Sequence, residues 1–432
     1  MNKVAKNATW IIACRVVQAV FALVINMLTA RYLGPSNFGL ITYASSLVAF
    51  VVPVMQLGFS DILVQEIVNN PENEGVILGT SMLLSICSSF CCIIGVTTFA
   101  FIANQNELVT IIVCLLYSFI LFFRALDLIQ CWFQAKLLSK YTAVVSLFAY
   151  VIVSAYKIYI LFTAKNVYWF AVANAFDFAL ISISSIIIYH RLGGQKLSFS
   201  SELGKKMFSR SKHYILSNMM VTVFAQTDKI MIKLMIDEAA TGYYGAAVAC
   251  AGMTSFVFTA IIDSFRPSVF EAHATSDNLF QRRLAMLYSI IIYLSLAQSA
   301  VMTALAGFII QVLYGNAYYP AVSALQIIVW YTTFSYLGAV RNIWVLANNK
   351  QNYLWIINLI GASANVILNV VFIPIIGING AALASLITQF FTNVIVGYII
   401  KPITPNNEIM LKGLNIRYVF DAIKILRCRN SK

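Results

Sequence analysis

Residues 76–103 read VILGTSMLLSICSSFCCIIGVTTFAFIA, an apolar stretch without a charged side chain. A helix needs about 20 predominantly apolar residues to cross about 30 Å of hydrocarbon. With this stretch, the 432-residue chain contains twelve runs of comparable length, which predicts an all-α polytopic membrane protein with twelve transmembrane helices. The other runs lie near residues 8–32, 39–58, 108–130, 141–163, 167–189, 213–236, 243–265, 284–313, 320–346, 353–375 and 378–400.

The composition excludes most soluble activities. Mean hydropathy is +0.82, and charged residues make up 10% of the chain, against about 25% in soluble domains. The sequence has no phosphate-binding glycine loop, no His-Glu-x-x-His motif and no long external loop that could fold as a catalytic domain. Seven of the eight cysteines lie in or beside the apolar runs, where small buried side chains are typical. We therefore expect no enzyme activity, no metal and no cofactor.

The distribution of basic residues predicts the orientation in the membrane, because Lys and Arg stay on the cytoplasmic side. With both termini cytoplasmic, most of the 29 Lys and Arg residues fall in cytoplasmic connections, and only Arg31 and Lys165 fall in external ones. The loop 59–75 is an exception, since it carries four carboxylates and no basic residue. The net charge of +13 fits this bias and anionic lipid, so no nucleic-acid partner is expected.

A repeat divides the chain into two halves. Phe38-Gly39 ends the first predicted hairpin and Tyr244-Gly245 ends the seventh-to-eighth hairpin, while a polar stripe recurs on the helix before each. The predicted halves share one topology and enclose a central cavity that opens alternately to each side. The predicted organisation is a six-helix bundle at 1–190, a basic cytoplasmic linker at 191–212, a second six-helix bundle at 213–400 and a basic amphipathic cytoplasmic tail at 401–432.

Charged and amide side chains within the apolar runs are the candidate cavity residues, because lipid exposure of a charge at the bilayer centre costs about 2.5–3.5 kcal/mol. Cations outnumber carboxylates among them, which favours an anionic phosphate or diphosphate as ligand. The predicted substrate-binding residues are Arg15, Gln18, Asn26, Lys157, Gln226, Lys229, Lys233 and Arg341. The predicted ion-coupling residues are Asp127, Asp177 and Asp228.

Other interpretations of these residues stay open. Arg124 and Asp127 are three positions apart, so they are expected to form a structural ion pair. Lys233 lies near the outer end of its run and could instead extend towards the membrane surface. Arg341 lies near a cytoplasmic end and could act in a gate or be solvated. The asparagines of run 353–375 could simply hydrogen-bond helix to helix.

Four motifs carry a resemblance to a known family. They are Arg31-Tyr-Leu-Gly34-Pro35-Ser-Asn-Phe38-Gly39, Gln226-Thr-Asp228-Lys229-Ile-Met-Ile, Gly242-Tyr243-Tyr-Gly245-Ala-Ala and Pro374-Ile-Ile-Gly377-Ile-Asn-Gly380-Ala-Ala. With twelve runs and the repeat, the chain resembles the polysaccharide-export flippases. These are the O-antigen or Wzx-type flippases of the multidrug/oligosaccharidyl-lipid/polysaccharide exporter superfamily.

The resemblance implies a protein of the bacterial inner (cytoplasmic) membrane. It would flip an undecaprenyl-diphosphate-linked oligosaccharide, an O-antigen unit or similar, from the cytoplasmic to the periplasmic leaflet by alternating access. It also implies an O-antigen polymerase and a chain-length regulator as partners. The alternative is an ion-coupled multidrug exporter of the same superfamily, for which a cavity rich in carboxylates and aromatic side chains is expected. A membrane enzyme would require an essential residue in a long loop, which this sequence lacks.

Overall fold

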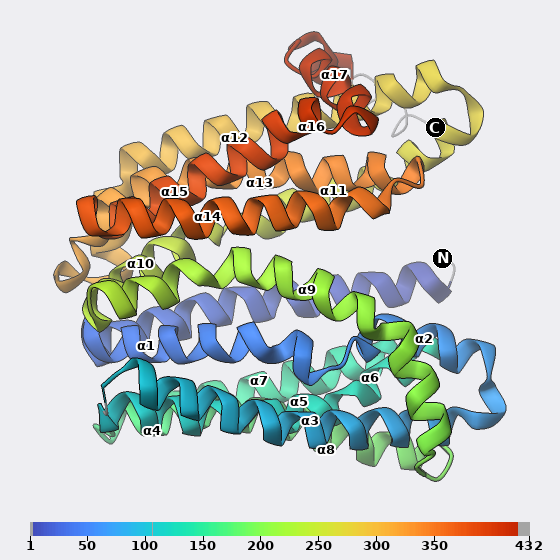
Figure 1. Cartoon of the computed structure of the whole chain (residues 1–432), viewed down its shortest axis with the longest axis vertical. Coiled ribbons are helices and arrows are strands. Elements are labelled where there is room, and N and C mark those ends of the chain that lie inside the picture. Colours follow the sequence, from blue (N-terminus) through green and yellow to red (C-terminus); the bar gives the residue numbers. More distant parts are fainter. Residues whose placement is uncertain (1–2, 106, 422–432) are drawn as a thin grey trace. The chain divides into compact units, whose positions relative to one another are not determined.

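The computed structural model describes residues 3–105 and 107–421, with the side chains of 3–17, 19 and 20 excepted. Every regular element in this part of the chain is a helix (Figure 1). Contacts group the chain into two compact units, Met1–Gly242 and Tyr243–Lys432, and each is described by itself. α9 therefore packs with the first unit, although the sequence predicts that the second bundle starts at 213. The division into two bundles of six helices each, which was inferred from the sequence repeat, stays a prediction.

The first unit is built around one long helix. α1 (Lys3–Met55) packs against α3, α4, α7, α8 and α9. The other elements of the unit are α2 (Phe59–Asn69), η1 (Pro71–Asn73), α3 (Glu74–Ala103), α4 (Leu108–Ser118), α5 (Ile120–Leu126), η2 (Asp127–Ile129), α6 (Gln130–Ala135), α7 (Ser139–Phe162), α8 (Val167–Arg191) and α9 (Ser201–Met235).

α1 contains the first predicted hairpin as a sharp break. Gly34 has φ 71° and ψ 173°, outside the helical region, and Pro35 follows it. Only glycine adopts a positive φ without strain, and proline removes one backbone donor. The predicted first and second runs, 8–32 and 39–58, are therefore the two arms of one broken helix.

The two hairpins that suggest the repeat lie against each other. A Cβ at Gly39 would collide with the carbonyl of Glu238 and the amide of Gly242, and a Cβ at Gly242 would collide with the carbonyl of Pro35. Both positions are glycine because the two backbones touch there. The glycines found as a sequence signature thus serve as a contact between α1 and the start of α10 (Glu238–Gly252).

The acidic loop that breaks the charge rule is neutralised by basic segments of the same unit. Arg210 of α9 forms a salt bridge with Glu66, and Lys136 Nζ lies 2.8 Å from Glu74 Oε2. The connection between α8 and α9 also runs along this loop, where the Gly75 amide donates to Gln195 Oε1 over 3.1 Å. The loop 59–75 and the basic linker therefore lie at one end of the unit, as the predicted topology requires. The linker is irregular only up to Ser200, since α9 begins at Ser201.

The second unit contains the remaining helices and one π-helical segment. After α10 come α11 (Ser255–Thr275), α12 (Asp277–Tyr314), η3 (Asn316–Tyr318), α13 (Ala321–Ala347), η4 (Gln351–Tyr353), α14 (Leu354–Ile376), α15 (Ile378–Phe390), the π-helix η5 (Phe391–Ile395), α16 (Val396–Ile399), η6 (Lys401–Ile403) and α17 (Thr404–Lys412). α13 packs against α11, α12 and α15, and α14 packs against α15.

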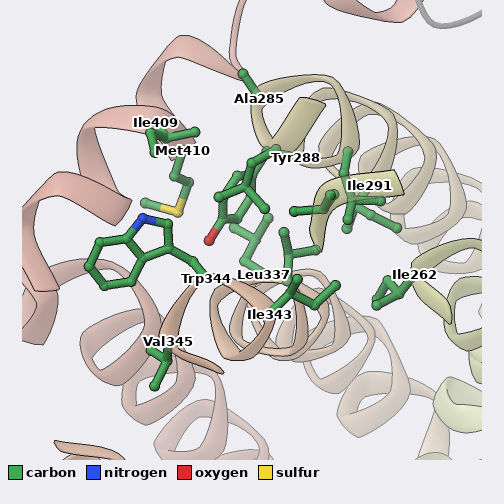
Figure 2. Close-up of a cluster of buried hydrophobic side chains, with 14 of the residues drawn as sticks. Ile262, Ala285, Tyr288, Ile291, Leu337, Ile343, Trp344, Val345, Ile409 and Met410 are labelled. Carbon is green, nitrogen blue, oxygen red and sulfur yellow. The ribbon is translucent and has the colours of Figure 1, made fainter. Parts of the chain in front are cut away.

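The tail helix α17 is part of the core of the second unit. Figure 2 shows Ile409 and Met410 beside Trp344 of α13 and Tyr288 of α12, and all four are at most 5% exposed. Burial of such side chains is worth about 1.5–3 kcal/mol each. The start of the predicted surface tail is therefore anchored in the bundle, whereas Leu414 is 54% exposed. Residues 422–432, the end of that tail, lie outside the described part of the chain.

The helices account for all twelve predicted runs. Nine helical stretches among the described residues are long and apolar enough to cross a membrane. The kinked α1 counts once among them, although it contains two predicted runs. α9 and α13 are the two further helices that match predicted runs, and both carry charged and polar residues.

Candidate functional site

A cluster of charged side chains joins α7 and α8 in the first unit. Lys157 Nζ on α7 donates to Asn174 Oδ1 on α8 over 3.0 Å. Asp177 lies one turn further along α8 and interacts electrostatically with Lys157. Its Oδ1 atom is buried and has no hydrogen-bond partner among the described residues. A buried carboxylate oxygen without a donor can accept a proton or a small cation, which suits ion coupling.

Two further charges extend this cluster through the short turn η2. Asp127 accepts a hydrogen bond from Gln130 and interacts electrostatically with Asp177. The guanidinium of Arg124 lies 5.1 Å from the centre of the Phe178 ring. Arg124 and Asp127, the expected ion pair, interact electrostatically, although no direct salt bridge joins them among the described side chains. The fourth predicted run is broken here into α4, α5, η2 and α6.

α9 contributes a separate cation. Lys229 Nζ donates to Gln226 Oε1 over 3.1 Å, one turn back on the same helix, and its side chain is half-buried. Lys229 forms no salt bridge among the described side chains. Its hydrogen-bond acceptor there is the neutral amide of Gln226. Asp228 is its electrostatic partner but is 6% exposed and points to another side of the helix. Lys229 thus has no hydrogen-bonded carboxylate among the described residues.

The polar stripe predicted on the first run lies on the helix that packs along α9. Gln18 and Asn26 of α1 are both half-buried, and α1 and α9 are in contact (Figure 1). The Arg15 side chain lies outside the described residues. The two helices on which the polar stripe recurs are therefore neighbours, while the repeat of the stripe stays a prediction.

Lys233 is fully engaged by carboxylates. Its Nζ lies 3.0 Å from Glu107 Oε2 and 3.1 Å from Glu238 Oε2, and its side chain is 8% exposed. These bonds join α9 to the starts of α4 and α10. A cation held by two carboxylates is a structural link in this conformation and offers no free charge to an anion.

Arg341 is the buried cation of the second unit. It lies on α13, is 5% exposed, and donates from Nη1 to the Thr392 carbonyl over 2.9 Å. That carbonyl belongs to η5, where a π-helical turn changes the backbone hydrogen-bonding pattern. Among the described residues, the Arg341 Nε atom has no hydrogen-bond partner. This arginine therefore contacts the π-helical segment of the last membrane helix and has one donor without a partner in the described part of the chain.

Sequence reasoning missed the neutral and acidic partners of these charges. Asn174 is three residues before Asp177 on α8, so a polar-stripe search of that run would have found it. Gln130 was not predicted because it directly follows the turn η2, for which the sequence has no signal. Glu107 and Glu238 lie in connections predicted to be external, outside the apolar runs that supplied the candidate residues.

These observations define the class of protein. Helices of membrane-spanning length that carry half-buried charges and amides at depth are typical of membrane transport proteins, since such groups are retained where they line pathways or pair with each other. The protein is therefore a multi-pass membrane protein with the architecture of a transporter.

The family follows from direct comparison. Residues 4–273 match the polysaccharide biosynthesis protein family, and the chain belongs to that family. It is 25% identical over 271 residues to an uncharacterized membrane protein of Methanocaldococcus jannaschii. That alignment covers 60% of this chain and 52% of the archaeal protein, so it spans about half the length of that curated relative.

Solved structures establish the fold. The lipid II flippase MurJ in an inward closed conformation matches with a TM-score of 0.68 at 13% identity, over 93% of this chain and 90% of that chain. An inward-facing multidrug resistance MATE transporter of the MOP superfamily matches with a TM-score of 0.65 at 14% identity, over 91% of this chain and 96% of that one. The predicted twelve-helix, two-bundle fold is confirmed. The side of the membrane on which the termini lie stays a prediction.

Proposed function

We propose that this chain is a flippase that moves a polyprenyl-diphosphate-linked oligosaccharide across the membrane. The observation that carries this proposal is the environment of Lys229. This half-buried cation at membrane depth hydrogen-bonds only to the neutral amide of Gln226 in the described contacts. A positive charge that no carboxylate binds directly is suited to a diphosphate, which accepts charge-assisted hydrogen bonds. Membership of the polysaccharide biosynthesis family supports a sugar-bearing substrate, and the MurJ fold supports a lipid-linked one.

The proposal assigns different roles to the remaining candidates. Arg15, Gln18, Asn26, Lys157 and Gln226 would contact the diphosphate or sugar, and Arg341 would contribute its free Nε donor after a change of conformation. Asp127, Asp177 and Asp228 would respond to a coupling ion. Lys233 would reach substrate only if its two salt bridges opened. The proposed substrate is an O-antigen or similar unit on undecaprenyl diphosphate, moved to the periplasmic leaflet of a bacterial inner membrane by alternating access. A polymerase and a chain-length regulator would be its partners.

The test is complementation of a deletion strain with matched variants. Lys229→Gln should abolish surface polysaccharide and leave lipid-linked repeat units on the cytoplasmic face. Lys229→Arg should restore at least part of the output, because it keeps the charge. Lys205→Gln is the control, since Lys205 is exposed on the same helix and loses the same charge. Normal polysaccharide in the Lys229→Gln strain, at wild-type protein levels, would contradict the proposed site.

A multidrug exporter is the second candidate, and the unpartnered Asp177 oxygen favours it together with the MATE-like fold. A carboxylate at membrane depth could bind a cationic drug or its coupling ion. This candidate requires that the deletion strain keep its polysaccharide and become sensitive to cationic drugs. Asp177→Asn should then reproduce that sensitivity, whereas Lys229→Gln should not.

A further inference from the structure

An open pocket lies where the tail segment crosses the start of α12. It has a volume of about 450 Å³, and its lining includes Gln281, Arg282, Lys412, Asn415, Arg417 and Asp421. This size is in the range of small-ligand sites, about 300–1,000 Å³. The pocket is formed within the second unit and is separate from the charges of α7, α8 and α9 described above.

Several contacts hold the tail in place around this pocket. Lys412 Nζ donates to Gln281 Oε1 over 2.9 Å. Tyr293 donates its hydroxyl to the Leu414 carbonyl over 2.6 Å. Ile409 and Met410, directly before this segment, are buried against α12 and α13 (Figure 2). The pocket is therefore preformed by a segment anchored in the core.

The charge of the pocket is positive. Three cations line it, Arg282, Lys412 and Arg417, against the single carboxylate of Asp421. Arg282 Nη2 lies 2.8 Å from Asp421 Oδ2, so this carboxylate offsets one of them. The Arg417 side chain is exposed and makes no hydrogen bond or salt bridge among the described residues. The sequence after Asp421 adds four further basic residues and no acidic one.

Apolar side chains beside the cations indicate a lipid rather than a soluble anion. Leu411 is 50% exposed, Leu414 54%, Ile416 49% and Phe420 58%. The pocket also lies at the first turns of α12, a helix of membrane-spanning length. Cations next to exposed apolar residues at the end of a membrane helix are typical of a segment that contacts lipid at the interface.

We propose that this pocket binds the phosphate head group of an anionic membrane lipid. Arg417, Lys412 and Arg282 donate hydrogen bonds to the phosphate oxygens, and the acyl chains lie along Leu414, Ile416 and Phe420. The site is independent of the flippase assignment, because it involves none of the residues assigned to transport.

The experiment is native mass spectrometry of the full-length protein, purified in a neutral detergent and supplied with equal amounts of phosphatidylglycerol and phosphatidylcholine. The wild type should retain phosphatidylglycerol preferentially. The Arg282→Gln/Arg417→Gln variant should lose this preference by at least about fivefold, since each basic residue near a membrane surface is worth about a factor of five. Asp421→Asn should increase the preference. Arg283→Gln is the matched control, because it removes the same charge one residue away and outside the pocket lining.

The outcomes of this experiment distinguish a lipid head group from a soluble phosphate as the ligand. Equal lipid retention by the double variant and by Arg283→Gln would overturn the proposal. So would displacement of phosphatidylglycerol by inorganic pyrophosphate at a concentration comparable to that of the lipid, because a soluble phosphate would then be the ligand. Opposite effects of Asp421→Asn and of the double variant, with folding verified by thermal unfolding, would support it, since misfolding would shift both in the same direction.

Discussion

At the scale of single residues, the described contacts divide the cations of the first unit by their partners. Lys233 is held by two carboxylates, Lys157 by an amide with a carboxylate nearby, and Lys229 by an amide of its own helix. A cation that is already neutralised contributes mainly to stability, whereas one without a bound carboxylate can serve an anionic ligand. The position of each lysine along its helix could not predict whether a carboxylate binds it, because the glutamates that bind Lys233 include one far away in sequence.

Replacing Lys233 should affect stability more than transport. Lys233→Met leaves Glu107 and Glu238 close together without their shared cation, at a cost of about 1–2 kcal/mol because both glutamates are partly exposed. We expect a lower midpoint of thermal unfolding in detergent than for Lys229→Met. The same two variants, compared at equal protein levels in cells, should rank in the opposite order for loss of polysaccharide. A Lys233→Met protein as stable as Lys229→Met would contradict the structural role.

Lys157 and Asp177 should be energetically coupled. Lys157→Met removes the cation near a carboxylate that already has an unsatisfied oxygen, so it should destabilise the protein more than the double variant Lys157→Met/Asp177→Asn does. A double-mutant cycle of thermal stability in detergent should give a coupling of about 1 kcal/mol. Additive effects of the two substitutions would show that the residues act separately.

At the scale of elements, the breaks in the helices set the positions of the site residues. α1 is kinked at Gly34, the fourth predicted run contains the 3-10 turn η2 with Asp127, and the last run contains the π-helical segment η5. Irregular backbone at membrane depth is tolerated only inside a protein. Asp127 lies in one of these irregular segments, and Arg341 of α13 contacts another through the Thr392 carbonyl.

The contact between the two hairpins should be sensitive to a single methyl group. Gly39→Ala would place a Cβ on the backbone of Glu238 and Gly242, and separating two packed helices costs about 1–3 kcal/mol. Gly95→Ala is the control, because a Cβ at exposed Gly95 of α3 meets nothing. We expect reduced membrane levels and a lower unfolding midpoint for Gly39→Ala only. Equal stability of the two variants would show that the hairpins are not in close contact.

The sequence predicted the helices better than the contacts that their side chains make. Twelve helices followed from apolar runs, because a membrane leaves little choice of secondary structure. The polar stripes of α1 and α9 followed from helical spacing. The three breaks and the tail docking through Ile409 and Met410 did not, since a π-turn or a packed tail has no local signal. The Arg124–Asp127 interaction followed from their spacing, since the two residues do interact electrostatically, but the stacking of Arg124 on Phe178 did not, because that contact belongs to tertiary structure.

At the scale of the whole molecule, the family and the fold are both compatible with the proposed transport role. The chain belongs to the polysaccharide biosynthesis protein family and shares its fold with a flippase and with drug exporters. The acidic loop 59–75 and the basic connection before α9 lie together at one end of the first unit. These contacts give a reason for the one exception to the predicted charge distribution, because the carboxylates of the loop neutralise nearby cations.

The most direct test of the account is transport by the purified protein. The full chain, reconstituted in vesicles, is given a fluorescent polyprenyl-diphosphate-linked oligosaccharide, and a membrane-impermeant quencher reports the fraction in the outer leaflet over time. We expect that wild type equilibrates the leaflets, that Lys205→Gln does so at a similar rate, and that Lys229→Gln is at least about tenfold slower. Equal rates for Lys229→Gln and wild type would contradict the cationic site, and no movement above protein-free vesicles would contradict the flippase itself.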